Sequence, residues 1–307
     1  TGSPNTAVGW NSLSANTTGG SNTAMGYLAL ALNTTAANNT AVGREALTAN
    51  TEGASNTAVG EAALDANTTG GSNAAVGRDA LGANTTGSFN QAFGRNALLT
   101  NTTGQYNNAF GNDALKVNTA SSNSAFGHAA LVANTTGALN TAVGANALSS
   151  NISGGDNVAV GNNALTVSTG SRNTALGYNA MTDTTSGQDN TAVGTSALGN
   201  NTTASNNTAV GKSALTANTT GASNTAVGRE SLSANTTANQ NTAVGMYGLR
   251  QTTTGSNNTA MGYASLITNT TGVGNVALGH NSLYANTTAN NNTAVGTNAG
   301  VSVTEGH

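Results

Sequence analysis

Side chains able to do acid–base, nucleophilic or metal chemistry are sparse in this sequence. Among 307 residues there are eleven Asp and Glu, eight Lys and Arg, three His and no Cys. The histidines are His128, His280 and His307, and no Ser or Asp recurs beside them at a spacing that would pair a nucleophile with a base. Because Cys is absent, thiolate chemistry is excluded. The sequence predicts no catalytic residue, no metal ligand and no cofactor, and we expect the chain not to be an enzyme.

Acidic residues show no regular placement either. Calcium-binding solenoids place an acidic residue in each turn. Here the eleven acidic residues occupy inconsistent positions of a repeat that occurs eighteen times. An enzymatic alternative, a polysaccharide lyase built on a β-helix, would need acids or bases gathered on one face, and the sequence contains no such cluster.

Aromatic residues are the best candidates for recognition. Trp10, Tyr27, Tyr178 and Tyr263 each directly follow a glycine of the repeat. Such rings stack on sugars and hydrogen-bond through their polar edge. These four are therefore candidate surface recognition residues for host or cell-surface glycans. The same position elsewhere holds Arg, Glu and Lys, so a solvated face that only keeps the protein soluble is the alternative, and the variability favours it.

A repeat of seventeen residues positions all of these side chains. Fifteen of the seventeen intervals between its successive glycines are seventeen residues long. The two that end at Gly127 and Gly177 are sixteen residues long, and each lacks one residue of the same variable turn, which we therefore expect to be a surface loop. The eighteen glycines are Gly9, Gly26, Gly43, Gly60, Gly77, Gly94, Gly111, Gly127, Gly144, Gly161, Gly177, Gly194, Gly211, Gly228, Gly245, Gly262, Gly279 and Gly296.

The consensus of the repeat is N-T-A-V-G-x-x-A-L-x-x-N-T-T-G-x-x. Two glycines and a run of Asn and Thr leave too few consecutive helix formers for a helix, whereas two short strands separated by turns fit each unit. A unit this short cannot bury its own core, so copies must stack. The sequence predicts an all-β fold, a parallel β-solenoid (β-roll) of about 18 coils, at roughly 4.8 Å per coil and about 85 Å in all.

Each constant position has an expected structural role in such a stack. Asn tolerates left-handed turns and can pair its amide with the same Asn one coil away, Gly permits close approach of two backbones, and Ala suits a thin interior. Val and Leu form an apolar stripe. In two successive repeats these positions are Asn39, Ala41, Val42, Gly43 and Leu47, and then Asn56, Ala58, Val59, Gly60 and Leu64.

Adjacent apolar residues raise the question of oligomeric state. Ala41 and Val42 are neighbours, as are Ala46 and Leu47, although successive side chains of a strand point to opposite faces. If Ala fills the interior, Val points outward, and a stripe of such residues is more apolar surface than a soluble monomer exposes. We expect three copies to pack around a closed axis and bury it. The alternative is a strand that bends at the glycine and turns both residues inward.

Charge and composition limit the partners. The net charge is −3, and scattered basic residues do not form the patch that binds nucleic acid. No run of about eighteen apolar residues is present, so we expect no membrane insertion. The repeat extends throughout the chain, so we predict one repeat domain over residues 1–307. Because Thr1 opens directly into a repeat, we expect a fragment of a longer chain.

The motif N-T-A-V-G-x-x-A-L resembles the head repeats of trimeric autotransporter adhesins, which carry a similar Asn-Ser-Val-Ala-Ile-Gly signature. It is also similar to repeats of phage tail fibres and of bacterial surface proteins that end in an endosialidase-type intramolecular chaperone. The resemblance covers the whole chain and implies a trimeric parallel β-roll, with Asn39, Ala41, Val42, Gly43 and Ala46 at structural positions. The unit here is longer because of its N-T-T-G turn, and the sequence shows no coiled-coil stalk, membrane anchor or chaperone domain.

These observations predict a non-catalytic structural shaft or head segment of an extracellular fibre or adhesin. It would lie on a cell surface or in a virion fibre, form a homotrimer and contact surface glycans. The alternative is a monomeric ice-binding β-solenoid, because regular Thr ladders match an ice lattice. Against it, the Thr before the invariant Ala is replaced in six repeats, by Ala74, Gln91, Asn108, Ser124, Val158 and Val276.

Overall fold

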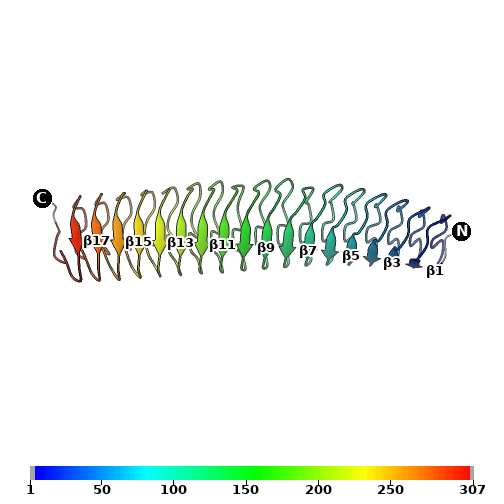
Figure 1. Ribbon diagram of the computed structural model, residues 1–307, viewed down its shortest axis with the longest axis horizontal. Coiled ribbons are helices and arrows are strands. Elements are labelled where there is room, and N and C mark those ends of the chain that lie inside the picture. Colours follow the sequence, from blue (N-terminus) through cyan, green and yellow to red (C-terminus); the bar gives the residue numbers. More distant parts are fainter. Residues whose placement is uncertain (1–3, 305–307) are drawn as a thin grey trace. The chain divides into compact units, whose positions relative to one another are not determined.

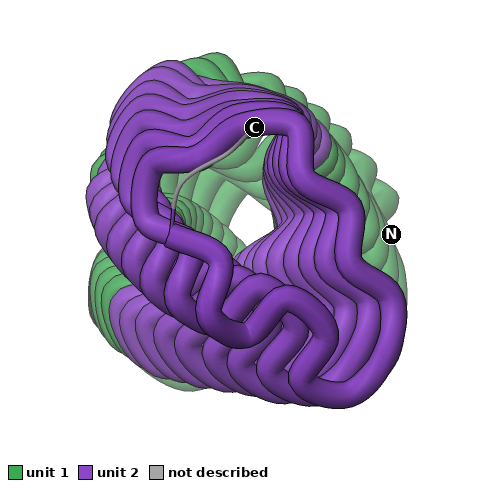
Figure 2. Tube along the Cα trace, turned by 90° about the vertical axis from the view of Figure 1, so that its left-hand side faces the viewer, with its two compact units in different colours: residues 1–155 green, residues 156–307 purple. Residues whose placement is uncertain are grey.

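The computed structural model describes residues 4–304, so both ends of the predicted 1–307 domain, His307 included, lie outside the described part. Within residues 4–304 the chain is all-β, with eighteen strands and no helix. It divides into two compact units, residues 1–155 and residues 156–307, which Figure 2 shows in different colours. The predicted parallel β-solenoid with a seventeen-residue repeat is confirmed in each unit.

Unit 1 contains one strand per repeat, and each strand pairs in parallel with the strand of the next repeat (Figure 1). The pairing is in phase with the repeat, so that Ala41 lies opposite Ala58. The strands are β1 (Asn5–Val8), β2 (Asn22–Met25), β3 (Thr40–Val42), β4 (Thr57–Val59), β5 (Ala74–Val76), β6 (Gln91–Phe93), β7 (Asn108–Phe110), β8 (Ser124–Phe126) and β9 (Thr141–Val143).

Unit 2 follows the same plan, and Ala192 lies opposite Ala209. Its first repeat interval is one of the two short ones, yet Ala159 still lies opposite Ala175, because the variable turn absorbs the missing residue. The strands are β10 (Val158–Val160), β11 (Thr174–Leu176), β12 (Thr191–Val193), β13 (Thr208–Val210), β14 (Thr225–Val227), β15 (Thr242–Val244), β16 (Thr259–Met261), β17 (Val276–Leu278) and β18 (Thr293–Val295).

The expectation of two strands in each repeat is wrong. Only the N-T-A-V segment forms a strand, and the A-L segment is a hydrogen-bonded turn. Two residues of that turn, Glu45 and Leu47, have φ angles of 60° and 53°, in the left-handed region that a strand does not allow. The turn still bonds to its neighbours, because Leu47 N donates to Ala63 O at 3.0 Å in the next repeat.

The left-handed leucine recurs in every repeat that has one. Met181 and Gly300, which replace it in two repeats, keep φ angles of 51° and 60°. A left-handed conformation costs a non-glycine residue about 1–2 kcal/mol. Leu47 is fully buried, and burying a leucine side chain contributes about 1.5–3 kcal/mol. The core contact therefore offsets the backbone strain.

The glycine of N-T-A-V-G meets two requirements at once. Gly43 has a φ of +138°, which side chains rarely allow. A Cβ atom at Gly43 would also lie 2.4 Å from Gly60 O, in the next repeat. The chain leaves its strand and turns at this point, so a side chain would prevent both the turn and the stacking.

Two buried columns of polar residues tie successive coils together. The first asparagine column is the invariant Asn of each repeat: Asn39 Oδ1 accepts from Asn56 N at 2.9 Å, and Asn56 Nδ2 donates to Gly70 O at 2.8 Å. The second asparagine column is the residue seven places after the glycine. There Asn50 Nδ2 donates to Asn33 Oδ1 at 3.0 Å and to Gly53 O at 2.9 Å. Most of these buried amide atoms are thereby satisfied between coils rather than by water, although a few, such as Asn39 Nδ2, have no partner.

Candidate functional site

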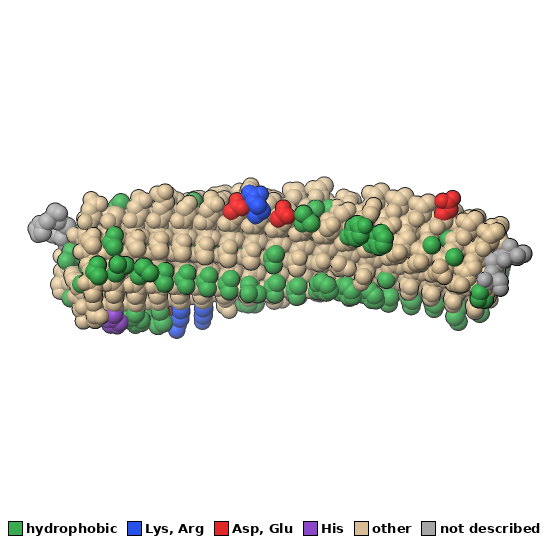
Figure 3. Space-filling view, in the orientation of Figure 1, with side chains coloured by type: hydrophobic (Ala, Val, Ile, Leu, Met, Phe, Trp, Pro, Cys, Tyr) green, Lys and Arg blue, Asp and Glu red, His purple; other side chains and the backbone are tan. Residues whose placement is uncertain are grey.

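The outer face of the sheet carries a continuous apolar column, which we call the outer stripe. In strand β3 the inward Ala41 is fully buried, whereas Thr40 and Val42 on either side of it are partly exposed. Figure 3 shows part of this column as a row of green side chains. The outer stripe comprises Val8, Met25, Val42, Val59, Val76, Phe93, Phe110, Phe126 and Val143 in unit 1, and Val160, Leu176, Val193, Val210, Val227, Val244, Met261, Leu278 and Val295 in unit 2.

The two apolar pairs of the repeat behave differently. Ala41 points inward and Val42 outward, as alternation along a strand requires. Ala46 and Leu47 are both fully buried, because the left-handed turn after the glycine breaks the alternation. Bending at the glycine therefore accounts for the second pair alone, and the first pair leaves its larger member at the surface.

Exposure along the outer stripe is substantial. Met25, Leu176 and Met261 are 44%, 45% and 46% exposed. None of the eighteen residues carries a charge. Soluble monomers rarely display a contiguous apolar patch of several hundred Å². The stripe therefore leaves an uncharged apolar column in contact with water along the outer face of the sheet.

Three phenylalanines enlarge the outer stripe in unit 1. The rings of Phe93 and Phe110 stack with centroids 4.7 Å apart, and those of Phe110 and Phe126 stack at 5.0 Å. Parallel in-register strands place equivalent residues close enough for such stacking. The phenylalanines place larger side chains at three successive positions of a stripe otherwise made of Val, Met and Leu.

The four candidate recognition residues lie on the surface in separate places. Trp10 and Tyr27, in unit 1, stack with ring centroids 5.0 Å apart and are 62% and 45% exposed. Tyr178, in unit 2, is 54% exposed. Tyr263 lies five repeats further along unit 2, where it stacks on His280 at 5.2 Å. The structure thus forms one pair from Trp10 and Tyr27 and does not gather all four into one site.

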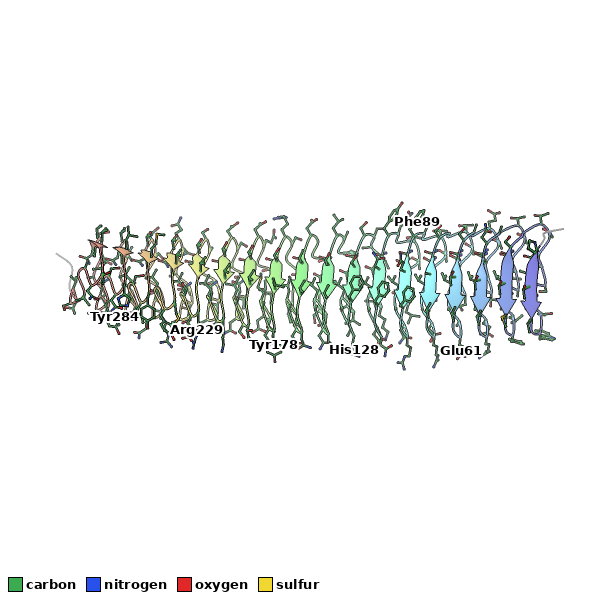
Figure 4. The ribbon with its side chains drawn as sticks, turned by 60° about the horizontal axis from the view of Figure 1, so that its bottom comes forward. Glu61, Phe89, His128, Tyr178, Arg229 and Tyr284 are labelled. Atoms are coloured by element: carbon green, nitrogen blue, oxygen red, sulfur yellow. The ribbon has the colours of Figure 1, made fainter. Side chains whose placement is uncertain are left out.

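Charged side chains also occupy the position directly after the repeat glycine and the position that follows it. Arg44 Nη1 lies 3.0 Å from Glu61 Oε1, and Arg78 Nε lies 3.9 Å from Glu61 Oε2. Figure 4 shows Glu61 and His128 projecting from the edge of unit 1 that lies away from Phe89. These ion pairs join successive coils, but each is exposed, so each contributes less than about 1 kcal/mol to stability.

Hydrogen bonds between coils also shift acid pKa values in unit 1. Asn96 Nδ2 donates to Asp113 Oδ1 at 2.9 Å, and Lys116 Nζ lies 3.2 Å from the same oxygen. Both contacts favour the carboxylate, with the Asn96 hydrogen bond the larger effect, and the pKa of Asp113 lies below its ordinary value. Asp113 therefore remains ionised at neutral pH and acts as a structural acceptor.

A second exposed aromatic pair was missed from the sequence. Phe89 and Tyr106 stack with ring centroids 5.1 Å apart and planes at 1°, and they are 50% and 55% exposed. Both occupy the position just before the invariant Asn and have left-handed φ angles of 60° and 57°. Ser, Asn and Asp prevail there, and Asn and Asp suit that conformation. Two aromatic residues at such a position are the signal that could have identified the pair.

The described residues offer no metal-binding cluster: in residues 4–304, no three His, Cys, Asp or Glu side chains lie close enough together to hold an ion. The same range contains no helix long and apolar enough to cross a membrane. No protein-family model matches the chain, and no curated protein matches it either.

Proposed function

We propose that this chain is a non-catalytic structural segment of an extracellular fibre or adhesin, and that its copies associate through the outer stripe as a homotrimer. The observation that carries the proposal is the stripe itself, which is uncharged, partly exposed and continuous over nine successive strands in each unit. Covering it with protein removes apolar surface from water, at about 25 cal/mol for each Å².

A second copy of the chain suits this stripe better than an unrelated partner. Equivalent side chains repeat at the spacing of parallel strands, roughly 4.8 Å. Another outer stripe has the same spacing, so apolar residues of two copies meet at every coil. Packing around a closed rotation axis buries the stripe of each copy without leaving one uncovered. Three narrow coils sharing one axis is the arrangement that the resemblance to adhesin head repeats also favours.

Glycan contacts are the second part of the proposal. Trp10 with Tyr27, Tyr178, and Tyr263 with His280 present exposed rings beside the outer stripe rather than within it. Association through the stripe would leave these rings available to stack on surface sugars. The segment would then act as a spacer that makes weak contacts along its surface.

The native mass of the purified chain tests association. One chain has a mass of 29.8 kDa, so light scattering should give about three times that value for a trimer. Val210→Asp with Val227→Asp places two charges in the stripe of unit 2 and should lower the mass to that of one chain. Asn206→Asp with Ser223→Asp adds two charges at exposed positions of the same repeats and should leave the trimer intact. A monomeric wild-type chain would refute the proposal.

Ice binding is the second candidate, because one observation favours it. The outer face carries a Thr column parallel to the outer stripe, and six successive strands of unit 2 keep it unbroken, from Thr174 to Thr259. Such a face binds ice only if no second copy covers it. A monomer that shows thermal hysteresis, reduced when Thr208 and Thr225 become Asp, would support this function over the fibre segment.

A further inference from the structure

We propose that a shallow groove on unit 2 binds an anionic saccharide through Arg250. This deepens the glycan-contact part of the proposed function and does not depend on trimer formation. The groove has a volume of about 460 Å³ and lies between the side chains two and five places after the glycines of neighbouring repeats. Its polar lining is Ser213, Thr216, Glu230, Ser233, Arg250 and Gln251.

Short side chains create the groove and extend it. A second hollow of about 240 Å³ shares Thr216 and continues along the preceding repeats, past Ser196 and Gly199. The positions that hold Ser and Gly here hold Tyr247 and Arg250 in the repeat that closes the groove. The result is a trough lined by hydroxyls, which pair with the hydroxyls of a sugar chain.

Positive charge gathers at the closed end. Lys212, Arg229 and Arg250 are three of the four Lys and Arg residues of unit 2, and they lie in three successive glycine-to-glycine steps of the repeat. Glu230 is the carboxylate among them, and it lies 3.1 Å from Arg229 and 2.9 Å from Arg250. Arg229, Arg250 and Glu230 form a group of net charge +1, of which Arg250 and Glu230 line the groove, in a chain of net negative charge. Asp183 lines the far hollow, at the opposite end from Arg250.

Arg250 is placed to receive an anion. Its guanidinium lies over the Tyr247 ring, 4.9 Å from the centroid, and donates one contact to Glu230. Guanidinium carries five N–H donors in a planar fork, so donors remain for a carboxylate or a sulfate. The contacts to Tyr247 and Glu230 hold the fork in place, which lowers the entropy lost on binding.

Aromatic rings continue the surface beyond Arg250. Tyr247 meets Tyr263 edge to face at 5.9 Å, and Tyr263 stacks on His280 at 5.2 Å. Figure 4 shows Arg229 and Tyr284 projecting from the same edge of unit 2. A saccharide with one acidic group would bind that group at Arg250, lay a ring face on the tyrosines and place its hydroxyls in the trough.

The comparable cluster of unit 1 lacks these properties. Arg44 and Arg78 both pair with Glu61, as Arg229 and Arg250 pair with Glu230, although Glu61 stands one place after its repeat glycine and Glu230 two. There, however, Arg44 also pairs with Glu45 at 3.0 Å and Arg78 with Asp79 at 3.1 Å. Three carboxylates against two cations leave a net negative surface, which repels an anionic ligand.

Titration calorimetry on the full chain tests the proposal, with three probes of matched length: hyaluronan for carboxylate, sulfated dextran for sulfate, and neutral dextran. At about 50 mM salt, where charge contacts are weakly screened, at least one anionic probe should bind and neutral dextran should not. Arg250→Gln should weaken binding at least about tenfold, because a charge-assisted contact is lost. The anionic probe that binds more tightly identifies the acidic group.

A second variant blocks the groove without removing charge. Ser233→Tyr fills it with a residue that the fold already accepts at the equivalent position, Tyr284, and should weaken binding to a similar extent. The matched controls are Arg78→Gln and Ser149→Tyr, which make the same changes in unit 1 and should bind like wild type.

Three outcomes would overturn the site. They are unchanged affinity in both groove variants, equal loss in the unit 1 controls, and an oligonucleotide of equal charge binding as tightly as the saccharide. Light scattering on the same samples separates this site from the proposed self-association. Arg250→Gln should keep the wild-type mass. Loss of saccharide binding at unchanged mass is then attributable to the groove and not to a change in self-association.

Discussion

The second asparagine column differs between the two units. In unit 1 every member is Asn, and Asn33, Asn50, Asn67, Asn84 and Asn101 each donate from Nδ2 to Oδ1 of the preceding member, at 2.8–3.1 Å. In unit 2 the column reads Ser168, Thr184, Asn201, Asn218, Asn235, Thr252, Asn269 and Asn286.

Unsatisfied buried atoms accompany these substitutions, and they also occur in unit 1, where Asn101 Oδ1 has no partner because Asn118 Nδ2 donates to Ala120 O instead. Thr184 Oγ1 and Asn235 Oδ1 are buried and have no hydrogen-bond partner. Asn235 precedes Thr252, whose hydroxyl donates instead to Asn269 O at 3.1 Å. An amide supplies both a donor and an acceptor at a distance that spans one coil, whereas a hydroxyl is shorter and bonds to the backbone. The column is therefore a series of local contacts that can break at one coil and resume at the next.

The largest expected effect comes from breaking the uninterrupted part of the unit 1 column, which extends from Asn16 to Asn101. Asn67→Thr removes the contacts of Asn67 with Asn50 Oδ1, Asn84 Nδ2 and Gly70 O, which are 2.8–2.9 Å long. We expect the free energy of unfolding to fall by about 2–3 kcal/mol. Urea unfolding measures the loss, and hydrogen exchange should place it in unit 1. The control is Ser88→Thr, a substitution in the same unit that keeps a hydroxyl group at its position. A loss no larger than in the control would mean that the amide contacts contribute little.

A smaller gain should follow from repairing the broken column. Thr252→Asn offers Nδ2 to the unpartnered Asn235 Oδ1 and an acceptor to Asn269 Nδ2. Because one threonine contact is lost, we expect a net gain of about 1 kcal/mol in the same urea assay. Thr254→Asn, at an exposed position two residues away, should change nothing. A destabilised Thr252→Asn variant would show that the coil around Thr252 has adapted to the shorter side chain.

The smallest effect concerns acid titration, in which the pKa values of Asp65 in unit 1 and Asp189 in unit 2 are shifted in opposite directions. Burial, with smaller contributions from Asp79 and Glu45, raises the pKa of Asp65 in unit 1. The pKa of Asp189 in unit 2 is lowered, because Arg172 Nε donates to it at 2.6 Å. Ionised Asp65 therefore destabilises unit 1 above its raised pKa, and this penalty disappears as the pH falls through that value. Asp189 stabilises unit 2 above its ordinary pKa, and this contribution is lost as the pH falls through its lowered value.

Two substitutions check these signs. Asp65→Asn should raise the melting temperature slightly at pH 7, which corresponds to a gain of less than about 1 kcal/mol in the free energy of unfolding. Near pH 3 it should not change the melting temperature. Asp189→Asn should lower it slightly at pH 7 and have no effect once the carboxyl is protonated. Calorimetric scans from pH 3 to 8 measure both. The same sign for both variants at pH 7 would contradict the assignment.

The fold followed from the sequence because period and composition act together. A glycine at fixed spacing, an invariant Asn and an invariant Ala define a stacked coil, and strand β3 with its inward Ala41 matches that expectation. That the A-L segment forms a turn and not a second strand could not be predicted from the sequence. The backbone of Leu47 is in the left-handed region, and the residue type does not predict that conformation, because leucine ordinarily avoids it.

The surface features were less predictable than the fold. The candidate rings Trp10 and Tyr27 follow from a single column, since they occupy the same position of successive repeats. The groove at Arg250 depends instead on the absence of bulk at Ser213 and Ser233, in two different columns of neighbouring coils. A repeat alignment compares each column with itself, so it does not reveal a space enclosed between columns.

The in-phase pairing of the strands has a consequence at the level of the gene. Each repeat of seventeen residues corresponds to a whole number of codons, and each strand contacts the equivalent strand of the next repeat. A duplication or deletion of one repeat by slipped replication therefore preserves the reading frame, the pairing and both asparagine columns. It lengthens or shortens the solenoid by one step of roughly 4.8 Å. Length is thus a trait that selection can adjust in small equal increments without redesigning the protein.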